Sequence, residues 1–99
     1  MKHIETVGKF CICKDSKGFF WAIREDWVDR NGRLTRQVNG LEGMMSETLE
    51  LCRERVRDKT ALDELRAQGV PSMVAVVMVM DKKTRQEAED ALRKAGMTF

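Results

Sequence analysis

Arginine is concentrated in one short segment of the chain. Between residues 30 and 38 there are three arginines and no acidic residue, and a fourth arginine lies at position 24. A guanidinium group can bind a phosphate or the edge of a base through two parallel hydrogen bonds, so this row is typical of a nucleic-acid contact surface. The alternative is a set of solubilising charges at a sheet edge. The residues that we expect to contact nucleic acid are Arg24, Arg30, Arg33, Arg36, Lys14 and Lys17.

A second surface could serve a protein partner. Trp27 lies beside two aspartates at the end of an aromatic segment, and tryptophan is enriched among the residues that dominate protein interfaces. Met44 and Met45 are adjacent, and methionine side chains adapt to partners of different shape. These three residues, with the mixed-charge helix that follows, form our candidate protein-contact surface. Packing at the rim of the core is the alternative for Trp27.

The three cysteines do not have the spacing of a metal or disulfide site. Cys11 and Cys13 fall on one face of a strand, whereas Cys52 falls on the apolar stripe of a helix. Structural zinc sites use C-x₂₋₄-C pairs, which are absent, and free cysteine is often buried. His3, the single histidine, lies at the N-terminus, where we expect no neighbouring group to support acid–base catalysis. We therefore expect no metal and no cofactor.

Acidic side chains recur along residues 47–58 at helical spacing, as paired catalytic carboxylates would. Arginine and lysine alternate with them, which is typical of a solvent-exposed, ion-paired helix face. The chain also lacks a glycine-rich phosphate loop, a nucleophile elbow and a paired-histidine motif. We expect no catalytic residues, and we expect that the protein is not an enzyme.

The elements that must position these residues begin with strands. Residues 7–13 alternate between two faces, and residues 19–24 do the same after the turn sequence at 15–18. Asn31-Gly32 is a strong hairpin signal before a third strand at 33–39. The first forty residues therefore predict a three-stranded antiparallel meander.

Helices follow from Ser46, which is a good N-cap residue. Met45, Leu49, Cys52 and Val56 form one stripe, but residues 62 and 65 lie off it, so the helix must bend, break or bury a second face. We place a break at residues 58–60, because Thr60 and the acid three residues later resemble a capping box. Gly69 and Pro71 would end the second helical segment.

The apolar run at 73–80 is β-branched and apolar on both faces, which favours a buried fourth strand. Thr84 and Glu87 form a capping box for a last helix. The expected fold is α+β with the order βββα(α)βα. The second face of strand 73–80 needs a cover, either from the last helix or from a second copy in a homodimer.

Length and composition limit the remaining choices. Ninety-nine residues predict a single domain spanning 1–99, and the net charge of +2 does not by itself indicate a polyanion partner. The longest apolar run has eight residues, where a membrane helix needs about 20. The N-terminal segment lacks the apolar stretch of a secretion signal. We expect a cytoplasmic location and no membrane partner.

The segment 14–22, KDSKGFFWA, resembles the first hairpin of HicB-type antitoxin domains, in which a charged glycine turn precedes an aromatic strand. The chain departs from that family by lacking its Pro-Gly-Cys turn and its Gly-Asp-Thr helix entry. Residues 21–49 are similar in layout to the arm-type DNA-binding domains of phage-type integrases. Each resemblance covers about half the chain and implies a small regulator carried on phage or other mobile DNA. The sequence thus predicts a nucleic-acid-binding regulator, with a protein-binding adaptor or inhibitor as the alternative.

Overall fold

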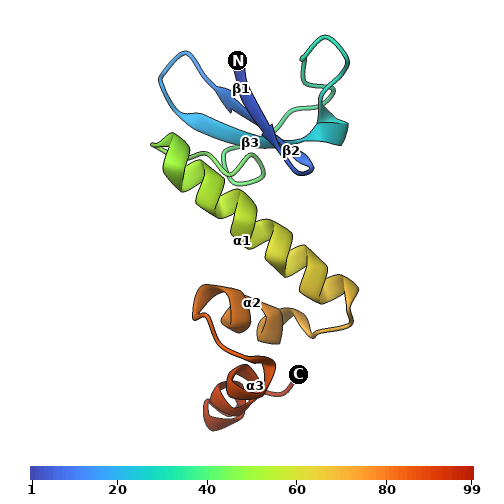
Figure 1. The fold of residues 1–99 in the computed structure, drawn as a ribbon, viewed down its shortest axis with the longest axis vertical. Coiled ribbons are helices and arrows are strands. Elements are labelled where there is room, and N and C mark those ends of the chain that lie inside the picture. Colours follow the sequence, from blue (N-terminus) through green and yellow to red (C-terminus); the bar gives the residue numbers. More distant parts are fainter. The chain divides into compact units, whose positions relative to one another are not determined.

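The computed structural model describes residues 1–99 and contains one three-stranded antiparallel sheet and three α-helices (Figure 1). The α+β class predicted from the sequence is therefore confirmed. The chain forms two compact units, Met1–Val56 and Arg57–Phe99, and helix α1 (Leu49–Ala67) contributes residues to both. None of the helices combines the length and the apolar character needed to cross a membrane.

The sheet of the first unit has the order β1 (Lys2–Val7), β2 (Phe10–Lys14) and β3 (Phe20–Arg24). It is a meander, as predicted, but it uses different strands. The predicted single strand over residues 7–13 is instead part of a β1–β2 hairpin, in which Val7 pairs with Phe10. Gly8 allows this tight reversal because it adopts a φ of 56°, which side chains with a Cβ rarely tolerate.

The predicted third strand at 33–39 is wrong. The short 3₁₀ helix η1 (Glu25–Trp27) follows β3, and only an isolated bridge between Val28 and Leu34 forms in the region beyond it. The open edge of β3 is instead paired with a later segment. Ala22 N donates to Gly43 O at 2.7 Å, and Phe20 and Ser46 exchange two 2.8 Å backbone hydrogen bonds. With these partners taken, residues 33–39 cannot pair with the edge of β3, where the meander prediction placed them.

The core of the first unit lies between one sheet face and the start of α1. Phe10, Ile12 and Ala22 from the strands pack with Cys52 and Val56 from the helix, and all five are buried. Cys52 is thus a core residue, as its position on the apolar stripe predicts. Burial raises the pKa of its thiol, which stays protonated at neutral pH.

Helix α1 is continuous, so the predicted break at residues 58–60 is wrong. Residues 58–60 are helical, and Lys59, within the expected break, forms an i,i+4 ion pair with Asp63 at 2.9 Å. Both apolar stripes of α1 are buried. Val56, on one stripe, lies in the core of the first unit, and Leu62, on the other, lies in the core of the second unit. It begins after Thr48, whose hydroxyl accepts from Leu51 N at 3.1 Å. The predicted N-cap, Ser46, belongs to the bridge with β3.

The predicted fourth strand is also wrong, because these residues form helix α2 (Ser72–Met80). The only sheet of the protein lies in the first unit, so the second unit offers no strand edge with which residues 73–80 could pair. A homodimer contact at these residues would therefore use a helix face and not the second face of a strand. Helix α3 (Arg85–Lys94) has the predicted capping box of Thr84 and Glu87. The buried residues of this unit are Leu62, Val70, Val74, Ala75, Ala88 and Leu92.

Candidate nucleic-acid interface

A turn after η1 that is closed by several hydrogen bonds carries two of the candidate arginines. The carboxylate of Asp29 accepts from Asn31 N at 2.8 Å and from Arg33 N at 2.9 Å. The backbone closes the same turn, since Asp29 N donates to Arg33 O and Gly32 N donates to Asp29 O. Gly32 has a φ of 78°, which explains the glycine at this position. We call residues 29–33 the basic turn.

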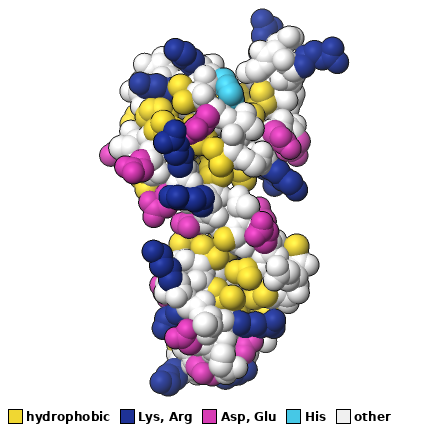
Figure 2. Space-filling view, in the orientation of Figure 1, with side chains coloured by type: hydrophobic (Ala, Val, Ile, Leu, Met, Phe, Trp, Pro, Cys, Tyr) yellow, Lys and Arg dark blue, Asp and Glu magenta, His cyan; other side chains and the backbone are white.

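The two arginines of the basic turn are available to a ligand. Arg30 and Arg33 are both exposed, and neither takes part in any of the ion pairs of the protein. Basic side chains project from the loop after β3 in Figure 2. The turn therefore holds two unpaired guanidinium groups on a backbone that Asp29 links through hydrogen bonds. Its key acid, Asp29, can be recognised in the sequence as the first residue of the Asp-x-Asn-Gly turn signal.

Arg24 and Arg36 lie near the basic turn, but they are engaged with other groups. The guanidinium carbons of Arg36 and Arg24 lie 4.5 Å and 5.8 Å from the centre of the Trp27 ring. Arg36 also donates to Glu42 at 2.6 Å, and Arg24 pairs with Asp26 at 3.4 Å. Both charges are therefore partly neutralised by neighbouring carboxylates.

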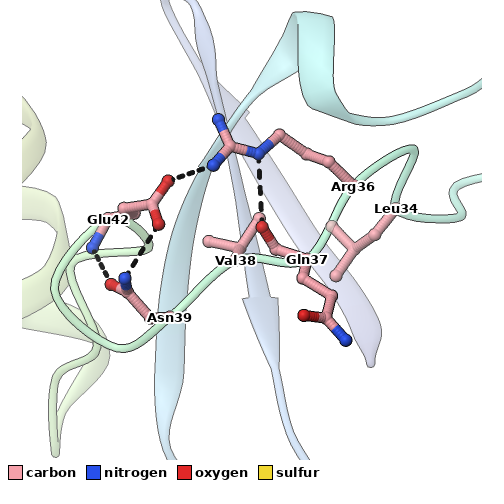
Figure 3. Close-up of a pocket in the computed structure, with 6 residues that line it drawn as sticks. All are labelled: Leu34, Arg36, Gln37, Val38, Asn39 and Glu42. Carbon is pink, nitrogen blue, oxygen red and sulfur yellow. Dashed lines mark hydrogen bonds and ion pairs between the residues drawn. The ribbon is translucent and has the colours of Figure 1, made fainter.

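Figure 3 shows Arg36 reaching across the loop to the Glu42 carboxylate. Glu42 also accepts from the side-chain amide of Asn39 at 2.8 Å, and its backbone N donates to the Asn39 side chain at 2.8 Å. These residues line an open hollow of about 700 Å³ together with Leu34, Gln37 and Val38. Sequence reasoning missed Glu42, because nothing in its spacing links it to Arg36.

A second hollow, of about 440 Å³, lies where the basic turn meets the sheet face that α1 does not cover. Cys13, Ile23, Val28 and Leu34 are among its apolar lining residues, and Asn31 and Arg33 add polar groups. The pKa of the Cys13 thiol is raised by burial and by the neighbouring Cys11. At neutral pH, Cys13 is therefore an uncharged part of this lining.

The structure does not bring all predicted basic residues together. Lys14 pairs with Phe20 and stacks over its ring at 5.4 Å, whereas Arg24 pairs with Phe10 at the other end of the β2–β3 ladder. Lys17 lies in the β2–β3 turn, where its backbone N donates to Asp15. These two lysines are therefore at the opposite end of the ladder from Arg24.

The predicted protein-contact residues also separate. Trp27 is half-buried beneath Arg24 and Arg36, and Met44 packs against the core of the first unit. Met45 is exposed, and its carbonyl accepts from Arg55 at 2.9 Å. Of the three residues, Met45 is exposed, whereas Trp27 and Met44 are partly buried.

The remaining chemistry-bearing groups do not form a metal centre. His3 Nε2 lies 3.0 Å from the Thr6 hydroxyl, and the three cysteines are free. No group of three or more histidine, cysteine or acidic side chains is arranged to hold a metal ion. Searches of family models, curated proteins and solved structures found no match to this chain, so the arrangement of its own residues must carry any functional argument.

Proposed function

We propose that this protein is a non-enzymatic nucleic-acid-binding regulator that contacts the phosphate backbone through its basic turn. The observation that carries the proposal is the pair of exposed, unpaired guanidinium groups of Arg30 and Arg33 on a turn fixed by Asp29. A phosphate can accept two hydrogen bonds from each guanidinium. An ordered turn loses little backbone entropy on binding, which favours affinity.

Within this proposal the four arginines have different roles. Arg30 and Arg33 bind phosphates, because no carboxylate competes for them. Arg36 and Arg24 hold Trp27 and add a weaker positive field, because Glu42 and Asp26 offset their charge. Contacts to phosphates fix position without reading bases, so we expect little sequence preference.

Fluorescence anisotropy with labelled random duplex DNA and single-stranded RNA tests the proposal. Binding should weaken as salt rises from about 50 to about 200 mM, because bound arginines release counterions from the nucleic acid. The double variant Arg30→Ala/Arg33→Ala should bind more weakly and should lower the slope of log affinity against log salt by about 2 for duplex DNA.

The matched control is Arg85→Ala/Arg93→Ala, which removes the same charge from α3, where both arginines pair with Glu89. It should change the slope little. Absence of binding at low salt would refute the proposal, as would equal losses in the two double variants.

A protein-binding adaptor is the second candidate function. Leu41 is 89% exposed in the turn before Gly43, and Leu34 and Met45 are exposed in the same unit. Apolar side chains in exposed loops are suited to a protein partner, and such an interface depends weakly on salt. Salt-insensitive capture of a protein that is lost in Leu41→Ser, with no nucleic-acid binding, would favour this candidate.

A further inference from the structure

Helix α2 has one apolar face that the second unit leaves uncovered. Val74 and Ala75 are fully buried in the core of the unit, whereas Met73, Val76 and Met80 are 41%, 39% and 54% exposed. Their spacing of three and four residues places them on one side of the helix. Figure 2 shows hydrophobic side chains gathered over the region of α2. We call Met73, Val76, Val77 and Met80 the α2 stripe.

The α2 stripe is symmetric along the helix. Read in either direction, its residues follow the order methionine, valine, valine, methionine with the same spacing. A two-fold axis between Val76 and Val77, perpendicular to the helix, would place a second α2 antiparallel to the first. Met73 would then face Met80 of the second copy, and Val76 would face its Val77. Such self-complementarity is what a closed dimer with two-fold symmetry requires.

The two ends of α2 are complementary in charge when the two-fold axis brings the second copy beside the first. The helix begins at Ser72 with Pro71 as N-cap residue and no side-chain cap, so its first N–H groups lack a side-chain acceptor. Asp81 follows the last residue of α2 and has no ion-pair partner. The two-fold axis places Asp81 of each copy at the level of Ser72 of the other. A carboxylate there is favoured by the positive end of the helix dipole.

The surface of α2 is also compatible with a second α2 as its partner. α2 contains no charged residue, so pairing it with a second α2 leaves no charge buried without a partner. A hollow of about 210 Å³, lined by Ser72, Met73, Val76 and Val77, lies beside the place that Met80 of the second copy would take. We propose that the α2 stripe is the interface of a two-fold symmetric homodimer of this chain.

The size of the helix sets the expected strength of the dimer. Nine residues span about 13 Å of helix, which offers less area than the roughly 800 Å² per partner of a standard interface. We therefore expect a reversible dimer that forms at micromolar or higher concentrations. Sedimentation of the full chain from about 10 μM to about 1 mM should show a concentration-dependent shift from monomer to dimer.

The first variant places a charge in the stripe. Met73→Lys should weaken dimerisation at least tenfold, because an unpaired ammonium would enter the apolar contact with Met80 of the second copy. Met45→Lys is the matched control, because Met45 is 38% exposed and lies in the first unit. It should leave the dimer unchanged. Circular dichroism of both variants shows whether their helices are intact.

A second pair of variants keeps the test independent of folding. Ser72→Asp should stabilise α2 within each monomer through the helix dipole, yet weaken the dimer severalfold by repulsion with Asp81 of the second copy. Ser72→Lys should destabilise α2 within each monomer and strengthen the dimer. A chain that stays monomeric up to the highest concentration overturns the proposal. Loss of the dimer in Met45→Lys, or changes of the same sign in the two Ser72 variants, overturns it as well.

Discussion

Arg36 stacks its guanidinium 4.5 Å above the Trp27 ring and donates to Glu42 at 2.6 Å. The arginine therefore links the 3₁₀ helix after β3 to the turn that precedes Gly43. Sequence reasoning assigned Arg36 to a nucleic-acid surface and Trp27 to a protein surface. In the structure the two residues form one cluster, so a change at either alters the surroundings of both.

The first prediction concerns this cluster. Arg36→Ala should expose Trp27 and destabilise the first unit by about 1 kcal/mol, the size of a partly exposed cation–π contact and surface ion pair. In a Trp21→Phe background, in which Trp27 is the only tryptophan, its emission should shift to the red and iodide should quench it more strongly. Arg30→Ala, which removes an unpaired arginine, should leave the emission unchanged. A similar shift in both variants would contradict the stacked arrangement.

The second prediction concerns the close approach of Gly43 to Trp21. A Cβ at position 43 would overlap the indole ring at Cε3 and would lie 3.2 Å from Val38 Cγ1. Gly43→Ala should therefore destabilise the protein by roughly 1–3 kcal/mol in urea unfolding. Gly40→Ala is the control, because its Cβ would meet only the Met45 side chain, at 3.5 Å. It should change the free energy of unfolding by less than about 0.5 kcal/mol.

The third prediction concerns the pH dependence of the β2–β3 turn. Asp15 accepts from Trp21 Nε1 at 2.8 Å and from Lys17 N and Phe19 N at 2.9 Å. The bond from Trp21, followed by the backbone bonds, lowers the pKa of Asp15 from its ordinary 3.8. Because the folded pKa lies below the unfolded one, the carboxylate contributes its full stability above about pH 4. That contribution is lost as the pH falls through the lower folded pKa.

Trp21 fluorescence in a Trp27→Phe background measures this loss directly. We expect a step at a pH below the ordinary aspartate value, and Asp15→Asn should abolish it because the amide does not titrate in this range. A step that persists in Asp15→Asn would assign the titration to another carboxylate.

The fourth prediction separates a real capping threonine from an apparent one. Thr84 accepts from Glu87 N at 3.2 Å at the start of α3, so Thr84→Ala should cost about 1 kcal/mol. Thr60 lies inside the continuous α1, where alanine is the better helix former, so Thr60→Ala should be neutral or slightly stabilising. Urea unfolding followed by circular dichroism measures both. Destabilisation by Thr60→Ala would support a helix break at residues 58–60.

Two local signals of helix ends were reliable guides to the fold. The Thr84–Glu87 capping box and the helix stop at Gly69 depend on neighbouring residues alone, and the structure contains both. Other local signals were wrong because tertiary contacts overrode them: Ser46 pairs with β3 instead of capping a helix, and no strand follows Asn31-Gly32. Thr60 resembles a cap, but the two apolar stripes of α1 each find a core, so the helix continues.

In the candidate site, too, some features could be predicted from the sequence and others could not. The arginines of the basic turn could be identified from the Asp29–Gly32 sequence, because a single acid closes that turn through nearby backbone N–H groups. The neutralisation of Arg36 by Glu42 could not, because their contact depends on the path of the loop between them. Charge counts along a sequence do not show which guanidinium groups already have a partner.

The α+β class and the capped last helix follow from periodicity and from a local capping box, whereas the predicted three-stranded meander has two of its strands misplaced. The tertiary structure alone decided the state of residues 72–80. A short β-branched run that is apolar on all sides can pair in a sheet or coil into a buried helix, and periodicity does not distinguish them. A strand must find hydrogen-bond partners on another segment, whereas a helix satisfies its backbone internally. The only sheet lies in the first unit, so this run is a helix in the second.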